Sequence, residues 1–109
     1  MKKYCLTLDL VDNQELINEY DRWHREVWPE VISSIKDAGI EHMEIYRYHN
    51  RLIMMMEVNS SYNAEKKAAM DLGNERVQEW EQLMWKYQQA LPGAQPGEKW
   101  VMMDKIFEL

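Results

Sequence analysis

The sequence predicts one α+β domain, in which two helical regions and four strands of an antiparallel sheet follow in the order β-α-β-β-α-β. Two observations lead to this prediction. The chain of 109 residues is long enough for one hydrophobic core but too short for two. Its apolar residues also change period along the chain, from every second position in strand-like runs to steps of three and four in helix-like runs. We therefore treat residues 1–109 as a single domain.

The first predicted strand covers residues 3–11. Its alternation indicates that one face lies on a core and carries four apolar side chains, Tyr4, Leu6, Leu8 and Leu10. Cys5 is the single cysteine of the chain and therefore cannot form an internal disulfide. Its apolar surroundings favour a small buried side chain over a nucleophile.

A helical region follows Asp12-Asn13, whose side chains are typical of helix N-caps. Apolar residues then recur in steps of three and four over residues 16–28. Pro29 has no N–H with which to continue the helix. We therefore expect a break near Trp28 and a second helix from Pro29 to about Ala38, which Gly39 ends.

Two strand-like runs meet at residues 49–51, and Asn50 suits the tight turn of a hairpin. The second run, Leu52 to Val58, is apolar at nearly every position, so we expect both of its faces to be covered. Glu57 is a carboxylate within this run. Such a group is usually paired with a cation, and less often it is a general base with a raised pKa.

A helix is expected in "SYNAEKKAAM", with an interruption at Gly73-Asn74 and a continuation through "ERVQEWEQLMWKYQQAL" to Pro92. The segment "PGAQPGE" is rich in proline and glycine, so we expect a connecting loop there. The last segment, "KWVMMDKIFEL", is predicted to be the closing strand.

This order of elements predicts the ferredoxin-like split βαβ arrangement, in which the helices cover one face of the antiparallel sheet. The opposite face would then expose an apolar patch around "LIMMMEV" that is large for a monomer. We therefore expect a homodimer in which a second subunit covers this face, and two facing sheets would enclose a cavity.

Charge and hydropathy exclude several partners. The formal net charge is −6 and no cluster of Lys or Arg offsets it, so the chain repels nucleic acid and anionic membrane surfaces. We expect neither as a partner. The sequence contains no run of about 18 apolar residues, the length that a bilayer-spanning helix needs. The charged N-terminal segment does not resemble a signal peptide. We expect a cytoplasmic protein.

The stretch "EYDRWHREVWPEV" carries the strongest chemical signal. On a helix, Tyr20, His24 and Trp28 would form one row, and imidazole is the side chain that most readily carries a proton near neutral pH. The alternative is that His24 is only a packed core residue. His42 and His49 lie in no motif, and we interpret both as ordinary surface or rim residues. No metal-binding motif is present, so no metal is expected.

Trp80 and Trp85 admit two interpretations in the same way. The chain has five tryptophans, and an indole can stack on the apolar face of a sugar ring or simply fill a core. Composition does not decide between them.

The same stretch resembles the helix signature of the L-rhamnose mutarotase family, in which a Tyr-x-x-x-His pair precedes Trp-Pro-Glu. Tyr20, His24, Trp28, Pro29 and Glu30 match at the family's spacing. The resemblance continues through "GIEHMEIYRYHNRLIMMMEV" and "VQEW" and covers nearly the full chain. It implies the fold of a dimeric α/β barrel and the interconversion of α and β anomers of a 6-deoxyhexose, without metal or cofactor.

The resemblance also implies roles for individual residues. The proton-donating histidine of the family corresponds to His24, and its substrate-contacting positions correspond to Tyr20, Met43, Trp80 and Glu81. Met43 replaces a tyrosine and Glu81 replaces a tryptophan of the family pattern. Because these changes alter the contacts available to a sugar, the implied substrate is L-rhamnose or L-fucose.

Two other functions fit the same architecture. One is a cofactor-independent monooxygenase of small aromatic substrates, since one fold can host several chemistries. The other is a non-catalytic dimer that binds a small ligand. The combination of the Tyr20–His24 pair with Trp-Pro-Glu favours the mutarotase.

Overall fold

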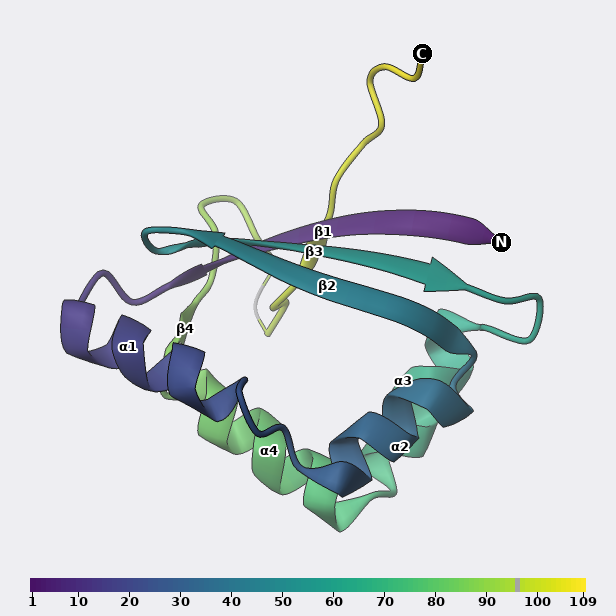
Figure 1. Cartoon of the computed structure of the whole chain (residues 1–109), viewed down its shortest axis with the longest axis horizontal. Helices are drawn as coiled ribbons and strands as arrows, with labels where there is room; N and C mark the ends of the chain where they lie inside the picture. The colour runs from purple at the N-terminus through teal and green to yellow at the C-terminus, as the bar shows by residue number, and fades with distance from the viewer. Residues whose placement is uncertain (96) are drawn as a thin grey trace.

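The computed structural model describes residues 1–95 and 97–109. Its strands and helices follow the predicted order, with both helical regions split in two (Figure 1). The elements are β1 (Lys2–Leu10), α1 (Gln14–Trp23), α2 (Pro29–Asp37), β2 (Ile40–Tyr48), β3 (Arg51–Val58), α3 (Ala64–Leu72), α4 (Glu75–Trp85), β4 (Gln88–Gln89) and β5 (Val101–Met102).

The sheet is antiparallel and β1 lies at its centre. β1 pairs with β3 from Lys2 to Asp9, in a register that places Leu6 opposite Met54, and β3 pairs in turn with β2. The other edge of β1 pairs with two short strands, β4 at Asp9–Leu10 and β5 at Leu6–Thr7. The fourth strand of the predicted sheet is therefore built from two separate pieces of chain.

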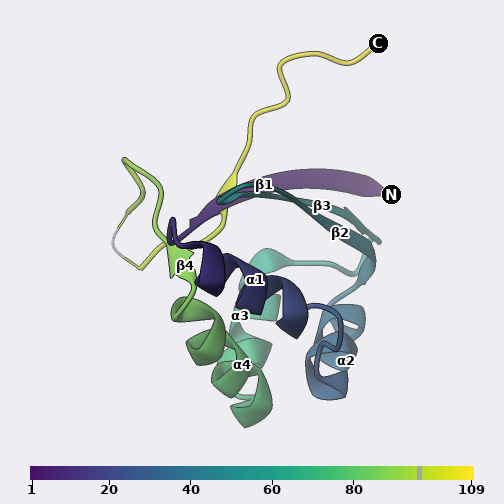
Figure 2. The same ribbon diagram turned by 60° about the vertical axis from the view of Figure 1, so that its left-hand side comes forward.

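All four helices lie on one side of the sheet, as the ferredoxin-like arrangement requires (Figures 1 and 2). The side chains of β1 that face them are the predicted alternating set, and Leu8 and Leu10 are almost fully buried. The larger group of buried core residues comes from the sheet and from α1, α2 and α4: Leu10, Ile17, Tyr20, Val31, Leu52, Trp80, Met84 and Tyr87.

Several predicted helix boundaries are confirmed. The Asn13 side chain caps α1 by accepting a hydrogen bond from the backbone N–H of Leu16, at 3.1 Å. Pro29 occupies the first turn of α2, where its missing N–H costs nothing. Gly73 and Asn74 separate α3 from α4, and Asn74 caps the second of these helices.

The first helix ends earlier than the periodicity predicts. α1 stops at Trp23 and His24 is its C-cap, so residues 24–28 form an irregular connection to α2. Trp28 therefore does not continue the helical row of Tyr20 and His24. The residue before a proline is sterically disfavoured in the helical conformation, and Trp28 indeed has ψ of 135°.

The prediction that the last helix extends to Pro92 is wrong. α4 ends at Trp85, and Gln88–Gln89 instead forms β4 on the edge of β1. The backbone N–H of Val11 donates to the carbonyl of Tyr87 at 2.8 Å. The Tyr87 ring is buried, with 2% exposed, and its hydroxyl accepts from Trp23 Nε1 at 3.0 Å. These contacts with β1 and α1 outweigh the local helical preference.

The predicted closing strand is also much shorter than expected. Strand pairing is limited to Val101–Met102, and the N–H of Met103 donates to the Cys5 carbonyl at 2.8 Å. Residues 104–109 extend away from the sheet on the side opposite the helices (Figure 1). We call residues 104–109 the C-terminal tail. Among the residues that the structure describes, no strand pairs with this tail.

The face of the sheet opposite the helices, here called the outer face, is open in the single chain. On β3, Leu52 and Met56 are buried against the helices, whereas Met55 between them is 44% exposed. Glu57 lies on the outer face, 3.6 Å from Lys3 Nζ, so it has the expected cation partner. Cys5 is partly buried and lies 3.6 Å from the Met103 sulfur.

No helix among the described residues is long and apolar enough to cross a membrane. The cytoplasmic location stays a prediction.

Gly39 provides a test of this fold. It has φ of +94°, and a Cβ added to it would lie 2.7 Å from Asn59 Oδ1 and 2.8 Å from Ser61 Oγ. We expect Gly39→Ala to lower the free energy of unfolding by about 1–3 kcal/mol, because both the backbone conformation and the space exclude a side chain. Urea denaturation followed by tryptophan fluorescence measures this loss.

Gly73 is the matched control. It has a negative φ, and the nearest atom to an added Cβ is 3.7 Å away, so Gly73→Ala should leave the stability unchanged or raise it by up to about 1 kcal/mol. Equal stabilities of the Gly39 and Gly73 variants would contradict this account of the α2–β2 turn.

Candidate active site

A cavity of about 650 Å³ lies between the helices and the face of the sheet that they cover. Its walls carry side chains from β1, β2, β3, α1, α2 and α4, together with β4 and the segment before β5. All five residues singled out from the sequence contribute to this one cavity: Tyr20, His24, Met43, Trp80 and Glu81. The fold therefore brings residues as far apart in the sequence as Tyr20 and Glu81 to one cavity.

Tyr20 and His24 form a pair at the end of α1. Their rings lie 4.4 Å apart, between centroids, and are tilted by 36°. Tyr20 is 3% exposed, whereas His24 is only partly buried. Because His24 caps the helix one turn after Tyr20, both rings face the cavity from the same element.

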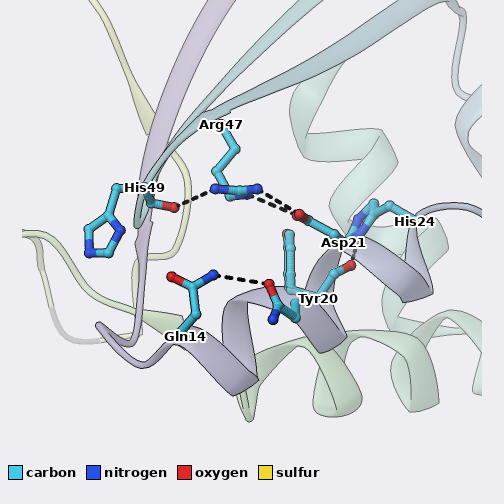
Figure 3. A network of polar contacts seen from close by, with 7 residues as sticks. Gln14, Tyr20, Asp21, His24, Arg47 and His49 are labelled. Carbon is cyan, nitrogen blue, oxygen red and sulfur yellow. Dashed lines mark hydrogen bonds and ion pairs between the residues drawn. The ribbon is translucent and has the colours of Figure 1, made fainter.

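A hydrogen bond fixes the tautomer of His24. Its Nδ1 lies 2.9 Å from the backbone carbonyl of Tyr20 (Figure 3). A carbonyl oxygen can only accept, so Nδ1 carries the proton and donates it, and in the neutral ring Nε2 keeps the lone pair. Burial lowers the pKa of His24 below its ordinary value, and this effect exceeds the opposing influence of the Tyr20 carbonyl and of Asp21. The ring is thus a neutral base at pH 7.

The Tyr20 hydroxyl is held in its protonated form. Burial raises the pKa of Tyr20 to about 12, although the hydrogen bond from Gln88 acts in the opposite direction. Gln88 Nε2 donates to the Tyr20 oxygen at 3.4 Å. At neutral pH the phenol can therefore give or accept a hydrogen bond, but it does not act as a base.

Three tryptophans form a cluster beside the two rings. Trp80 packs edge-to-face on Trp23 and Trp28, with centroid distances of 6.3 and 5.1 Å, and its indole lies 5.7 Å from His24. Trp80 lines the cavity, whereas Trp23 and Trp28 pack against the core cluster that contains Trp80. Trp23 and Trp28 therefore pack the end of α1 and the connection that follows it against the core, whereas Tyr20 and His24 face the cavity.

An ion pair attaches this end of α1 to the sheet. Arg47 of β2 donates to both carboxylate oxygens of Asp21, at 2.9 and 2.6 Å, and also to the His49 carbonyl at 3.0 Å (Figure 3). A bidentate pair of this kind fixes orientation as well as distance. It holds the turn of α1 that carries Tyr20 in place relative to the hairpin.

The two positions that depart from the family pattern also lie on the cavity wall. Met43 offers a thioether from β2, which is a weak acceptor and cannot donate. Glu81 of α4 lies near Lys99, and both line the cavity. Burial lowers the pKa of Lys99, while the Glu81 carboxylate acts against this shift. A carboxylate thus stands where the family pattern has an indole, and Lys99 lies near it.

Sequence reasoning missed Gln88, Lys99 and Trp100, which line the same cavity. Gln88 was placed within a helix, and the other two in the closing strand, so no local pattern marked them as site residues. His42 is half-exposed at the cavity wall, in agreement with its interpretation as a rim residue. In the described part of the chain, no three His, Cys, Asp or Glu side chains gather as a metal site. The absence of a metal and a cofactor stays a prediction.

Comparison with known proteins assigns the chain to a family. The family model of L-rhamnose mutarotase matches residues 3–109. The chain belongs to the L-rhamnose mutarotase family. An L-fucose mutarotase from Xanthomonas campestris pv. campestris is 51% identical to it over 111 residues, which cover 100% of this chain and 89% of that protein.

Solved structures agree with the fold of this family member. The crystal structure of an L-rhamnose mutarotase from Formosa agariphila superposes with a TM-score of 0.73 at 20% identity, and the match covers 100% of this chain and 99% of that one. A dimeric ferredoxin-like protein from an uncultured marine organism gives a TM-score of 0.53 at 14% identity, covering 98% and 90%. Both likenesses support the α+β ferredoxin-like fold.

The environment of His24 predicts a pH effect on this mutarotase-family chain. The unfolded state binds a proton on His24 at pH values just below 6.5, whereas the folded state does not until the pH reaches its lowered pKa. The free energy of unfolding should therefore fall as the pH is lowered from 6.5 through that pKa. Histidine ring NMR signals should show a midpoint below 6.5 for His24.

Comparison with His24→Gln isolates this contribution. The variant should lose the corresponding part of the pH dependence, because glutamine does not titrate. A His24 midpoint at or above 6.5 would show that the ring is not desolvated in the folded protein.

Proposed function

We propose that this protein is a cofactor-free mutarotase that interconverts the α and β anomers of a 6-deoxyhexose, L-fucose or L-rhamnose. The observation that carries the proposal is the cavity in which a neutral imidazole, a protonated phenol and an indole meet. Membership of the mutarotase family over residues 3–109 supports it. So does the identity of 51%, over the whole of this chain and 89% of the other, to a protein named L-fucose mutarotase.

In this proposal His24 is the proton carrier. Its Nε2 takes the proton of the anomeric hydroxyl, the bond between C1 and the ring oxygen breaks, and the imidazolium gives the same proton to the ring oxygen. The electron pair of that bond goes to the ring oxygen, so the open form is an aldehyde. Rotation about C1–C2 and closure with the roles reversed gives the other anomer. A neutral base near pH 7 suits both directions.

Tyr20 and Trp80 would hold the sugar while the proton moves. The phenol of Tyr20 stays protonated and can donate a hydrogen bond to a hydroxyl near His24. Trp80 supplies an apolar surface on which C–H groups of a sugar ring can stack. Neither role requires either residue to change its charge.

We propose L-fucose as the better substrate of the two. Met43 removes a hydrogen-bonding group that the family pattern provides, and Glu81 places a carboxylate where the pattern has an indole. These contacts differ from those expected for L-rhamnose. The relative that shares half of the residues over the whole chain carries the name L-fucose mutarotase.

One measurement separates the mutarotase from its two rivals. NMR saturation transfer between the α and β signals of L-fucose and L-rhamnose reports anomer exchange directly. A catalytic amount of the protein should accelerate exchange of L-fucose above the buffer rate. A binding-only dimer would perturb the sugar signals without accelerating exchange, and a monooxygenase would do neither. Exchange at the buffer rate for both sugars would overturn the proposal.

Substitution of the two central residues tests their roles. We expect His24→Ala to abolish exchange, because His24 carries the proton in this proposal and alanine cannot. Tyr20→Phe should reduce exchange only threefold to tenfold, roughly the loss of one neutral hydrogen bond of about 0.5–1.5 kcal/mol. Saturation transfer at pH 7 measures both rates.

His24→Gln is the stricter control. It keeps much of the shape and hydrogen bonding of the ring but cannot take up a proton in this pH range. Near-normal exchange by this variant would mean that His24 only positions the sugar. Glu81 would then be the first alternative base, because it lines the cavity, whereas Glu57 lies on the outer face beside Lys3.

We also propose that the protein acts as a homodimer through its outer face. Met55 and Tyr46 are 44% and 55% exposed there, and the C-terminal tail carries Ile106 and Phe107, which are 95% and 76% exposed. Burial of such side chains is favourable. A second copy would cover the face, and each tail would pack on the partner. A structural neighbour described as dimeric supports this assembly.

Light scattering at micromolar concentration should therefore give twice the chain mass of 13.2 kDa. A chain that ends after Asp104 should dimerise more weakly, because it lacks the apolar side chains of the tail. Leu72→Ala is the control, since Leu72 is 75% exposed on α3, away from the outer face. A stable monomer of the full chain, or an unchanged dimer after truncation, would contradict the corresponding part of the proposal.

A further inference from the structure

Gln88 is a buried polar residue with an unmet hydrogen-bonding group. Its side chain is on β4 and lines the cavity, and the residue is 8% exposed. One end of the carboxamide, Nε2, donates to the Tyr20 hydroxyl at 3.4 Å. The other end, Oε1, is the buried side-chain atom for which no partner is found among the described residues.

An unpaired buried carbonyl is costly, so its presence needs an explanation. The backbone pairing of β4 with Leu10 does not require glutamine, because any residue can make it. An apolar side chain of similar length would avoid the cost, as Met84 and Leu10 do in the same core. The carboxamide is therefore better suited to a partner that enters the cavity than to the free protein.

The neighbouring phenol indicates what that partner must be. Because Gln88 donates to the Tyr20 oxygen, the phenol retains its own proton for another acceptor. The two residues thus present one donor, the Tyr20 O–H, beside one acceptor, Gln88 Oε1. An alcohol group both donates and accepts, so one hydroxyl could satisfy the pair. If the carboxamide were rotated by 180°, Oε1 would accept from the Tyr20 hydroxyl and Nε2 would be the unpaired end. A sugar hydroxyl could then accept a hydrogen bond from Nε2.

We propose that Gln88 is a substrate-binding residue that accepts a hydrogen bond from a sugar hydroxyl held beside Tyr20. This inference rests on the proposed mutarotase function and adds to it a residue that reads one hydroxyl of the substrate. Gln88 takes no part in the proton transfer. It binds the sugar through a group that the free protein leaves unpaired.

Gln88→Met tests the inference by comparing stability with catalysis. The variant should unfold at a urea concentration close to that of the wild type, because removal of the unpaired buried carbonyl offsets the loss of the 3.4 Å hydrogen bond to Tyr20. It should also lower kcat/KM for anomer exchange of L-fucose by roughly tenfold to a hundredfold. A purely structural role would instead lower stability together with activity. Gln89→Met, on the exposed neighbour in β4, should change neither value.

Monodeoxy derivatives of L-fucose at C2, C3 and C4 identify the hydroxyl that Gln88 reads. For one derivative, wild type and Gln88→Met should exchange at equal rates, because the contact is absent from both. Gln88→Leu provides a second apolar variant if the methionine variant does not fold. An unchanged exchange of L-fucose by a folded apolar variant, or an equal loss for every derivative, would overturn the role of Gln88.

Anomer exchange by the wild type distinguishes failure of the role of Gln88 from failure of the proposed function. If the wild type exchanges L-fucose and Gln88→Met does so equally well, the inference fails while the proposed function stands. If the wild type exchanges neither L-fucose nor L-rhamnose above the buffer rate, the proposed function fails, and the assignment of Gln88 fails with it.

Discussion

The antiparallel pairing of β1 with β3 is the constraint on which the rest of the molecule depends. Direct opposition of Leu6 to Met54 and of Leu8 to Leu52 assigns every second side chain of both strands to the helix-covered face. A shift of one residue would turn these side chains to the outer face and remove the floor of the cavity. The same central strand receives β4 and β5 on its other edge, and so positions Gln88 beside Tyr20.

The end of α1 converts this scaffold into a chemical site. At the C-terminus of this helix the Tyr20 carbonyl accepts two hydrogen bonds from His24, one from its backbone N–H at 3.3 Å and one from its ring Nδ1 at 2.9 Å. The bond from the ring orients the imidazole, fixes its tautomer and keeps it one turn from Tyr20.

Much of the fold could be predicted because local signals agree with the tertiary structure. Pro29, Gly39 and Gly73-Asn74 each divide elements through their own backbone chemistry, and the alternation in β1 fixes its buried face. The end of α4 could not be predicted in this way. The segment around Tyr87 and Gln88 has helical periodicity, and only the free edge of β1 and the hydroxyl contact with Trp23 make it leave the helix.

The same distinction between local and long-range signals applies to the residues of the candidate site. Tyr20 and His24 are four residues apart, so a helical repeat is enough to place them together. Met43, Trp80 and Glu81 could be assigned only through the resemblance to a family, because long-range pairing brings them to the cavity. Gln88 has neither signal. Its importance depends on what surrounds its carboxamide, and a sequence does not record an unpaired atom.

Desolvation links the three polar groups of the cavity. The apolar wall that lowers the pKa of His24 also raises that of Tyr20, and it withholds water from Gln88 Oε1. At pH 7 the cavity thus holds a neutral base, a protonated phenol and an amide oxygen without a donor among the described residues. Hydrogen bonds formed in such surroundings are stronger than in water. A bound sugar is therefore stabilised most by the buried polar groups that have no partner in the free protein. A core filled entirely with apolar side chains would be more stable, but it would offer a ligand nothing to bind.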